Sequence, residues 1–347
     1  MTIARALPCL ALLTLFGSTQ AHAQVSSQDL DRALFNPILA SIVKIEAVTE
    51  AGGYSLGSAV AVKPGLFVSS CHVTAKAVSI SIQYQGLRWA VTGQRANLER
   101  DLCLLEAPRL SDVVPVQRGR SSDLRVGDGL AAIGYTFGAG LATQAGTVRA
   151  LHPVGGGTVI QSATYFNSGA SGGGLFTLDG RLVGILTFRL KGAEAYYFSI
   201  PVDWIDAELA RTDGFQPIAP LAATPPFWAQ PPERLPFFMR AATLQARNQW
   251  PEVVSLTETW AQAEADNAEP WFIRGQALVK LDQRLAAVDA YEHAVALNPR
   301  LAPAWFQLGE AQFQLGKLDA VRRSVKQLEA LDPELAADLR LRSSIQP

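Results

Sequence analysis

The sequence predicts a β-rich domain of the sandwich or barrel kind, followed by a domain of α-helical repeats. Three observations lead to this prediction. Short runs of β-branched and apolar residues recur between about residues 29 and 212, usually separated by Gly, Pro, Asn or Asp. A proline-rich stretch follows, and beyond it several residue types recur at an interval of 34. The length of 347 residues and the hydrophobic content of 48% are sufficient for two cores.

The first 23 residues are typical of a secretory signal peptide. Arg5 precedes an apolar segment at 6–16, and the triplet Ala-His-Ala at 21–23 lies where a signal peptidase would cut. The segment is shorter than a membrane span, and no later segment has the 18 or more apolar residues of one. A buried helix is the alternative interpretation. We expect cleavage after Ala23 and a mature chain, without a membrane span, in a periplasm or outside the cell.

Charge and cysteine content exclude several classes of protein. The chain has 30 Lys and Arg against 31 Asp and Glu, a formal net charge of -1, and no long basic run, so nothing indicates a nucleic-acid partner. Three cysteines are too few for a disulfide-dense scaffold or a zinc site of four thiolates.

The β-rich domain is predicted to occupy residues 29–212, and residues 213–236 are predicted to form an extended, semi-rigid linker because prolines are spread through them. The strands expected within the domain are residues 41–48, 58–62, 66–70, 77–83, 102–106, 129–135, 147–151, 172–177 and 182–188.

Residues 237–347 are predicted to be helical and repetitive. Ala287, Tyr291 and Ala294 lie at helical spacing. Three pairs of identical residues are separated by 34 positions, namely Trp271 and Trp305, Gly275 and Gly309, and Pro299 and Pro333.

This pattern resembles the tetratricopeptide repeat (TPR). The second copy has Val321 where the first has Ala287, and a degenerate earlier copy with Phe237, Ala241 and Leu244 lacks the closing proline. The resemblance implies a concave surface for peptides or helices, which would recruit a substrate or bind a protein partner. The alternative is that the repeats only cap and rigidify the domain before them.

A serine surrounded by glycines lies in the segment Asn-Ser-Gly-Ala-Ser-Gly-Gly-Gly-Leu at 167–175. Acyl transfer needs a hydroxyl on a sharp turn, with backbone N–H groups directed at the same point. Glycine permits such a backbone because it has no Cβ. Taken alone, the segment is equally consistent with a simple turn.

His72 is the best candidate for a base that would serve this hydroxyl. It follows the apolar run at 66–71, at the end of an expected strand. The other three histidines are less suitable, since His22 leaves with the signal peptide, His293 lies in a helical repeat and His152 precedes a proline in a Gly-rich turn.

Asp101 is the best candidate for the carboxylate that would orient the imidazole. It begins the apolar run Asp-Leu-Cys-Leu-Leu, so its side chain would enter a poorly solvated region. Asp112 and Asp123 precede less apolar sequence, and Asp128 lies in a turn by composition.

Here the chain resembles the trypsin-like serine proteases, in particular the exported HtrA/Deg branch, over about residues 35–210. The motifs are Ser-Cys-His-Val at 70–73, Arg-Asp-Leu-Cys-Leu-Leu at 100–105 and Gly-Ala-Ser-Gly-Gly at 169–173. Their order, His then Asp then Ser, is the order of this fold and not that of the α/β-hydrolases, which argues against an esterase. The resemblance implies two six-stranded-type antiparallel β-barrels of the chymotrypsin kind. It also implies a serine endopeptidase that needs no metal or organic cofactor.

The resemblance also implies a role for each residue. Ser171 attacks the peptide carbonyl, His72 transfers the proton, and Asp101 holds the imidazole tautomer. The backbone N–H groups of Gly169 and Ser171 stabilise the oxyanion. At Ala170 many digestive relatives carry an Asp that pairs with a new N-terminus, so we expect no zymogen step beyond signal removal.

A substrate pocket is implied around Tyr165, Thr187 and Phe188. Tyr165 lies six residues before the serine, at the position that forms the pocket floor in the family. Residues 129–178 contain no Asp or Glu, and burying the charge of Arg or Lys without a partner is costly. We therefore expect cleavage after small or medium apolar residues, although Glu194 on a later loop could alter this.

The two cysteines of the mature chain form a candidate disulfide. Cys71 is next to His72, and Cys103 is two residues from Asp101. If the imidazole and the carboxylate form a hydrogen bond, their strands are neighbours and the sulfurs come within plausible bridging range. Two packed free thiols are the alternative. For the whole chain, the alternative to a protease is a TPR-based binding scaffold with an idle protease domain.

Overall fold

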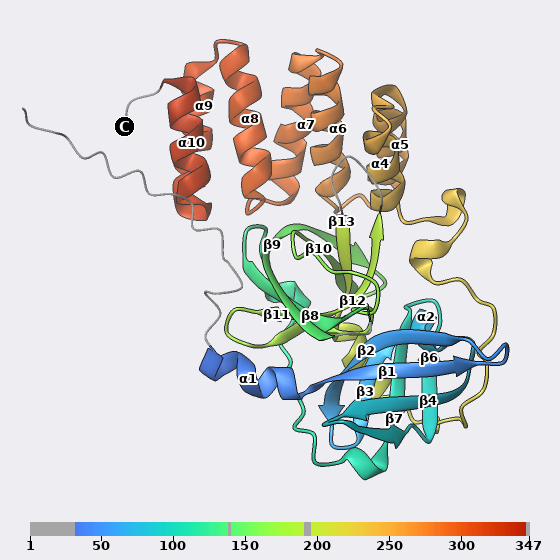
Figure 1. The fold of residues 1–347 in the computed structure, drawn as a ribbon. Coiled ribbons are helices and arrows are strands. Elements are labelled where there is room, and N and C mark those ends of the chain that lie inside the picture. Colours follow the sequence, from blue (N-terminus) through green and yellow to red (C-terminus); the bar gives the residue numbers. More distant parts are fainter. Residues whose placement is uncertain (1–31, 138–139, 191–195, 345–347) are drawn as a thin grey trace, which may run out of the picture.

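The computed structural model describes residues 32–137, 140–190 and 196–344, which form two β-sheets and a stack of helices (Figure 1). The expected fold class, barrel-like β-sheets followed by helical repeats, is confirmed. The expected signal peptide at 1–23 and the loop residue Glu194 lie outside the described residues.

The N-terminal sheet is an open, seven-stranded half-barrel in the order β5-β4-β1-β2-β3-β7-β6. It follows helix α1 (Arg32–Ala40), and the one-turn helix α2 (Cys71–Thr74) follows β3. Apolar side chains on its inner face, such as Val43, Ile45 and Phe67, are fully buried. Its strands are β1 (Ile42–Thr49), β2 (Tyr54–Lys63), β3 (Leu66–Ser70), β4 (Ala77–Tyr84), β5 (Leu87–Ala90), β6 (Gly93–Asn97) and β7 (Leu102–Glu106).

The second sheet is a closed six-stranded barrel in the order β10-β13-β12-β11-β8-β9. Helix α3 (Val202–Leu209) follows it, and two short 3-10 helices (Pro108–Leu110 and Ser121–Asp123) lie in the connection between the two sheets. Its strands are β8 (Gly129–Thr136), β9 (Gly140–Val154), β10 (Gly157–Ser162), β11 (Gly174–Thr177), β12 (Leu182–Leu190) and β13 (Tyr196–Pro201).

Four strands have no counterpart in the sequence prediction, namely β5, β6, β10 and β13. β5 has only four residues and β6 is rich in polar ones, so both are too short or too polar to stand out as strands in the sequence. β9 extends well beyond the expected strand at 147–151, because residues 140–147 pair with β8 and residues 148–154 pair with β10.

The chain after α3 is extended and lies against the N-terminal sheet. Gln216 pairs with Gln94 of β6 through two backbone hydrogen bonds of 2.8 and 2.9 Å. Further on, the N–H of Leu221 donates to the carbonyl of Ala75 at 2.7 Å. Two 3-10 helices, Phe227–Ala229 and Pro232–Arg234, complete the segment. The linker is therefore held by the β-sheet rather than free of it.

The C-terminal helices pack as successive antiparallel neighbours (Figure 1). Close approach depends on small residues, since a Cβ on Gly275 would lie 2.4 Å from the ring of Tyr291. The helices are α4 (Phe237–Ala246), α5 (Trp250–Ala263), α6 (Glu269–Lys280), α7 (Arg284–Leu297), α8 (Ala302–Gln314), α9 (Leu318–Leu331) and α10 (Pro333–Ser343). Among the described residues, no helix combines the length and the apolar character needed to cross a bilayer.

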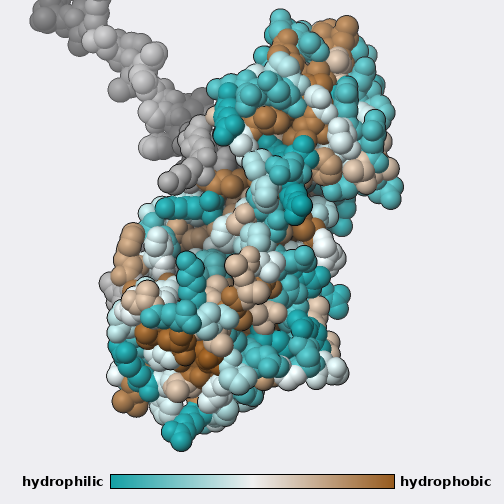
Figure 2. All heavy atoms as spheres, turned by 90° about the vertical axis from the view of Figure 1, so that its right-hand side faces the viewer, coloured by the Kyte–Doolittle hydropathy of each residue, from teal (hydrophilic) through white to brown (hydrophobic). Residues whose placement is uncertain are grey.

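The helical stack is attached to the closed barrel through a buried polar pair. Nδ1 of His152 on β9 lies 2.6 Å from Oε1 of Glu269 on α6. The imidazole also stacks on the ring of Phe238 on α4, with centroids 4.0 Å apart. Figure 2 shows the two parts in contact, with apolar side chains gathered in separate patches on each.

Candidate active site

Asp101 is held by the turn between β6 and β7. Its N–H donates to the carbonyl of Leu98 at 3.2 Å, and its φ of 55° lies in the left-handed region. Aspartate tolerates this conformation better than most residues with a Cβ. The side chain is 1% exposed, so the carboxylate needs hydrogen-bond donors from the protein.

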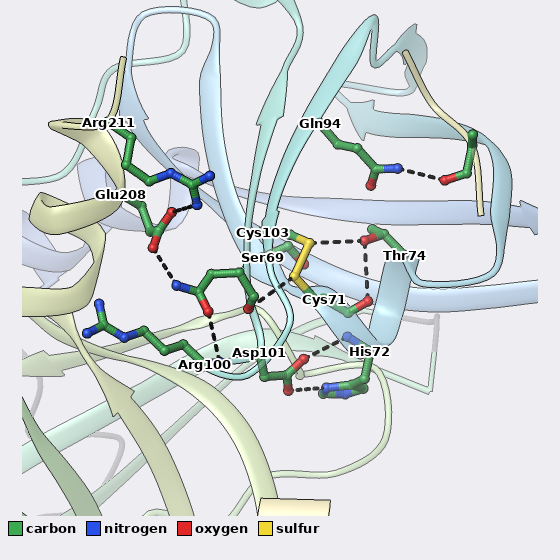
Figure 3. The surroundings of a disulfide bond; sticks show 12 residues. Ser69, Cys71, His72, Thr74, Gln94, Arg100, Asp101, Cys103, Glu208 and Arg211 are labelled. Atoms are coloured by element: carbon green, nitrogen blue, oxygen red, sulfur yellow. Dashed lines mark hydrogen bonds and ion pairs between the residues drawn. A yellow bond between two sulfur atoms is a disulfide. The ribbon is translucent and has the colours of Figure 1, made fainter. Parts of the chain in front are cut away.

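His72 supplies two of these donors from helix α2 (Figure 3). Its backbone N–H donates to Oδ1 of Asp101 at 2.7 Å, and its Nδ1 lies 2.6 Å from Oδ2. Because an ionised carboxylate only accepts, Nδ1 carries the proton in the neutral ring and Nε2 is left as a base. The side chain of His72 is 32% exposed, so the ring is accessible from solvent.

A third donor comes from the linker. Nε1 of Trp228 donates to Oδ2 of Asp101 at 3.1 Å, and the indole meets the imidazole of His72 edge-on with centroids 5.6 Å apart. The sequence analysis missed this residue. Nothing in its local sequence indicates it, because the contact depends on how the linker packs against the β-sheet.

Cys71 and Cys103 form a disulfide beside this pair of residues (Figure 3). β3 and β7 are antiparallel neighbours, and Ser69 is paired with Cys103 in their register. The Cα atoms of the two cysteines are 4.9 Å apart. The bond therefore links the residue before His72 to the strand that follows Asp101.

Ser171 lies on a tight turn ahead of β11. The N–H of Gly173 donates to the carbonyl of Ala170 at 2.8 Å, and Gly172 has a φ of 85°. A Cβ on Gly172 would lie 2.1 Å from the carbonyl oxygen of Ser58, so only glycine fits. The hydroxyl of Ser171 donates to the carbonyl of Thr187 over a long 3.4 Å.

The serine turn meets the histidine helix across β2. The N–H of Ser58 donates to the carbonyl of Ser171 at 2.8 Å. A Cβ on the preceding Gly57 would lie 3.2 Å from that carbonyl oxygen and 2.5 Å from a methyl group of Val73. Ser171 and Val73, the residue after His72, therefore both lie next to Gly57, although they are far apart in the sequence.

The backbone N–H groups of Gly169 and Ser171, the expected oxyanion donors, lie on the serine turn. The carbonyl of Ser168 accepts from the N–H of Phe137 at 2.8 Å, so the trans peptide directs the N–H of Gly169 the opposite way. The carbonyl of Ala170 accepts from the N–H of Gly173 at 2.8 Å, which directs the N–H of Ser171 the opposite way. No acceptor among residues 32–137, 140–190 and 196–344 is bonded to the N–H of Gly169 or of Ser171.

The three expected pocket residues have different surroundings. Tyr165 is 47% exposed and its ring meets Tyr197 edge-on, whereas Phe188 is buried in a stack with Phe198 and Trp228. The backbone carbonyl of Thr187 accepts the long hydrogen bond from the hydroxyl of Ser171. A pocket made by Tyr165, Thr187 and Phe188 together stays a prediction.

Two parts of the chain match the models of known protein families. Residues 57–185 match the family model of the trypsin-like peptidase domain, and residues 268–301 match that of the tetratricopeptide repeat. The chain is 33% identical over 168 residues to the periplasmic pH-dependent serine endoprotease DegQ of Escherichia coli, covering 45% of this chain and 36% of DegQ. It is 32% identical over 157 residues to serine protease HTR4 of Bos taurus, covering 42% and 32%.

The chain therefore spans about a third of the length of these curated relatives. Among solved structures, the active form of the Rv3671c protease of M. tuberculosis is 20% identical, with a TM-score of 0.49 over 55% of this chain and 90% of that one.

Proposed function

Because the chain carries a trypsin-like peptidase domain similar to those of HtrA and Deg proteases, followed by a tetratricopeptide repeat, we propose that it is an exported serine endopeptidase. One observation carries the proposal. The buried carboxylate of Asp101 lies 2.6 Å from Nδ1 of His72, and Val73, the next residue, borders the same Gly57 as the carbonyl of the glycine-flanked Ser171.

The three side chains act in sequence. The hydroxyl of Ser171 exchanges its long bond to the Thr187 carbonyl for one to Nε2 of His72 and attacks the substrate carbonyl carbon. His72 takes the hydroxyl proton and then donates it to the leaving amine, which breaks the C–N bond. Asp101 stays ionised, orients the ring and stabilises the imidazolium. Water then hydrolyses the acyl-enzyme by the same route.

The free N–H groups of Gly169 and Ser171 are suited to bind the oxyanion. Charge develops on the substrate oxygen as the tetrahedral intermediate forms, and donors already directed at that point need no rearrangement. A single donor of this kind is worth about 2.7–4 kcal/mol of the barrier. The bonds that hold the carbonyls of Ser168 and Ala170 fix the two peptides that carry these N–H groups.

The proposed specificity is for small or medium apolar residues before the cleaved bond. Residues 129–178 contain no carboxylate, and Tyr165 presents an exposed ring near the serine turn. A set of peptides varied at the cleaved position tests this. A clear preference for Arg or Lys would refute it.

The remaining parts have proposed roles that follow from the sequence. Residues 1–23 act as the signal peptide, residues 29–212 as the protease domain, residues 213–236 as the linker and residues 237–347 as the repeat domain. A periplasmic location is consistent with a relative named as periplasmic. The helical repeats recruit a polypeptide substrate or a protein partner.

A fluorophosphonate probe tests the central claim. The wild-type protein should be labelled on Ser171, and Ser171→Ala and His72→Ala should abolish labelling. Ser111→Ala, which changes an exposed serine in the connection between the sheets, should not. Absence of labelling in the wild type would refute the protease and favour a binding scaffold. Turnover of an unfolded protein with and without residues 237–347 then tests the role of the repeats.

A further inference from the structure

We propose that Trp228 is a positioning residue for the His72–Asp101 pair: its indole N–H, supplied by the linker, holds the carboxylate of Asp101 in the orientation that bonds Nδ1 of His72. This inference rests on the proposed function, since it assigns a task within the same site. Trp228 lies outside the segment that matches the trypsin-like peptidase family, which is residues 57–185.

The hydrogen bonds of the carboxylate show what the indole contributes. Oδ1 of Asp101 accepts one bond, from the N–H of His72, and Oδ2 accepts two, from Nδ1 of His72 and Nε1 of Trp228. Both bonds from His72 come from the residue that has to be positioned. Among the described residues, Trp228 is therefore the donor that holds the carboxylate independently of the histidine. At 1% exposure the carboxylate has little access to water that could replace this donor.

The indole is itself held on several sides. Its face stacks on Phe188 of β12 with centroids 5.1 Å apart and planes at 13°. The backbone beside it is tied to the turn that carries Asp101, because the N–H of Phe227 donates to the carbonyl of Glu99 at 2.8 Å. A donor fixed in this way can orient its acceptor rather than follow it.

Packing alone does not explain the bond. Trp204 lies nearby on α3, meets the ring of Phe227 edge-on at 5.8 Å and is buried. Its Nε1 has no hydrogen-bond partner among the described residues. An indole in this region can therefore serve as a packing residue with its N–H unused, which makes Trp204 a matched control for Trp228.

The test removes the N–H without changing the shape of the side chain. Each tryptophan in turn is replaced in the full-length protein by benzothienylalanine, in which sulfur stands in place of the indole N–H. For the Trp228 replacement we expect kcat on a peptide substrate to fall about tenfold, or about 1.4 kcal/mol, with KM within about twofold. The Trp204 replacement should leave both constants unchanged.

A second measurement does not depend on activity. The proton between Nδ1 of His72 and Asp101 gives a low-field NMR signal in a short hydrogen bond of this kind. We expect this signal to move and to exchange faster with water in the Trp228 replacement, and to stay in place in the Trp204 replacement. Trp228→Phe should reproduce the change in both measurements.

The outcomes separate this inference from the proposed function. If the Trp228 replacement retains wild-type kcat and an unchanged signal while Trp228→Ala loses both, the residue only packs and the inference is wrong. If the wild type neither cleaves peptides nor reacts with a fluorophosphonate, the proposed function fails. The NMR signal still decides whether Trp228 orients the pair.

Discussion

Reducing the disulfide between Cys71 and Cys103 should destabilise the N-terminal sheet without altering any other group. The bond joins residues separated by 32 positions, and both cysteines are buried. Reduction converts one S–S bond to two thiols in the same place, so the folded sheet keeps nearly all of its packing. The main effect is on the unfolded chain, which gains the freedom of an open loop.

The chain-entropy relation gives the size of the effect. For a loop of 32 residues the lost constraint corresponds to about 3.7 kcal/mol at 25 °C. At about 1.4 kcal/mol for each factor of ten, the opening equilibrium of the sheet should increase about 500-fold on reduction. That is a large part of the stability of an ordinary domain.

Hydrogen exchange followed by mass spectrometry is the suitable assay, because it reads each part of the molecule separately. Peptides that cover β3 and β7 should exchange about 500-fold faster in the reduced protein than in the oxidised one. Peptides from α5 to α9 are the internal control, since the repeat region contains no cysteine. Their exchange should change far less.

Two results would refute this reasoning. Equal exchange of β3 and β7 in both redox states would mean that the bond does not constrain the unfolded chain. Alkylation of two thiols in the unfolded, unreduced mature protein would mean that the bond does not form.

Three further changes have defined outcomes. Gly172→Ala should cut fluorophosphonate labelling about 100-fold with an unchanged circular dichroism spectrum, because the new Cβ would lie 2.1 Å from a β2 carbonyl; retained labelling would contradict this. Tyr291→Phe should raise the unfolding free energy of the helical stack by about 1 kcal/mol, measured by urea denaturation, because its buried hydroxyl has no partner among the described residues. Burial also raises the pKa of Tyr291, with a smaller contribution from a nearby glutamate, so the hydroxyl stays neutral at ordinary pH and no charge is lost. Glu269→Ala removes the partner of Nδ1 of His152 and should speed cleavage of residues 213–236 by an added protease; an unchanged rate would show that the pair does not hold the stack.

The parts of the site that the sequence could predict are those encoded in local motifs. His72 follows one apolar run and Asp101 precedes another, and such positions place a polar side chain at the margin of a core. The backbone around Ser171 needs glycine, because Gly169 and Gly172 have positive φ and Gly172 lies close to the carbonyl of Ser58. Such a requirement is visible in the sequence as a cluster of glycines. The 34-residue interval likewise predicts the repeats, because each helix pair must repeat the same contacts.

What could not be predicted depends on contacts between distant segments. The indole of Trp228 binds Asp101, which lies 127 residues earlier in the sequence. A proline-rich segment gives no indication that it supplies a hydrogen-bond donor to a distant carboxylate. The stack of Phe188 on Phe198 likewise joins two strands, β12 and β13, and the second of these was not predicted. The strands β5 and β6 are defined by their partners rather than by their own composition.

The pairing of Gln216 with Gln94 also determines where the β-rich part of the chain can be cut. β6 is an outer strand of an open sheet, and this pairing satisfies part of its free side. A protein shortened to end at residue 212, where composition alone suggests a boundary, would expose those amide groups to strands of other molecules and invite aggregation. The smallest soluble catalytic fragment should therefore extend at least to Trp228, well into the stretch that looks like a spacer.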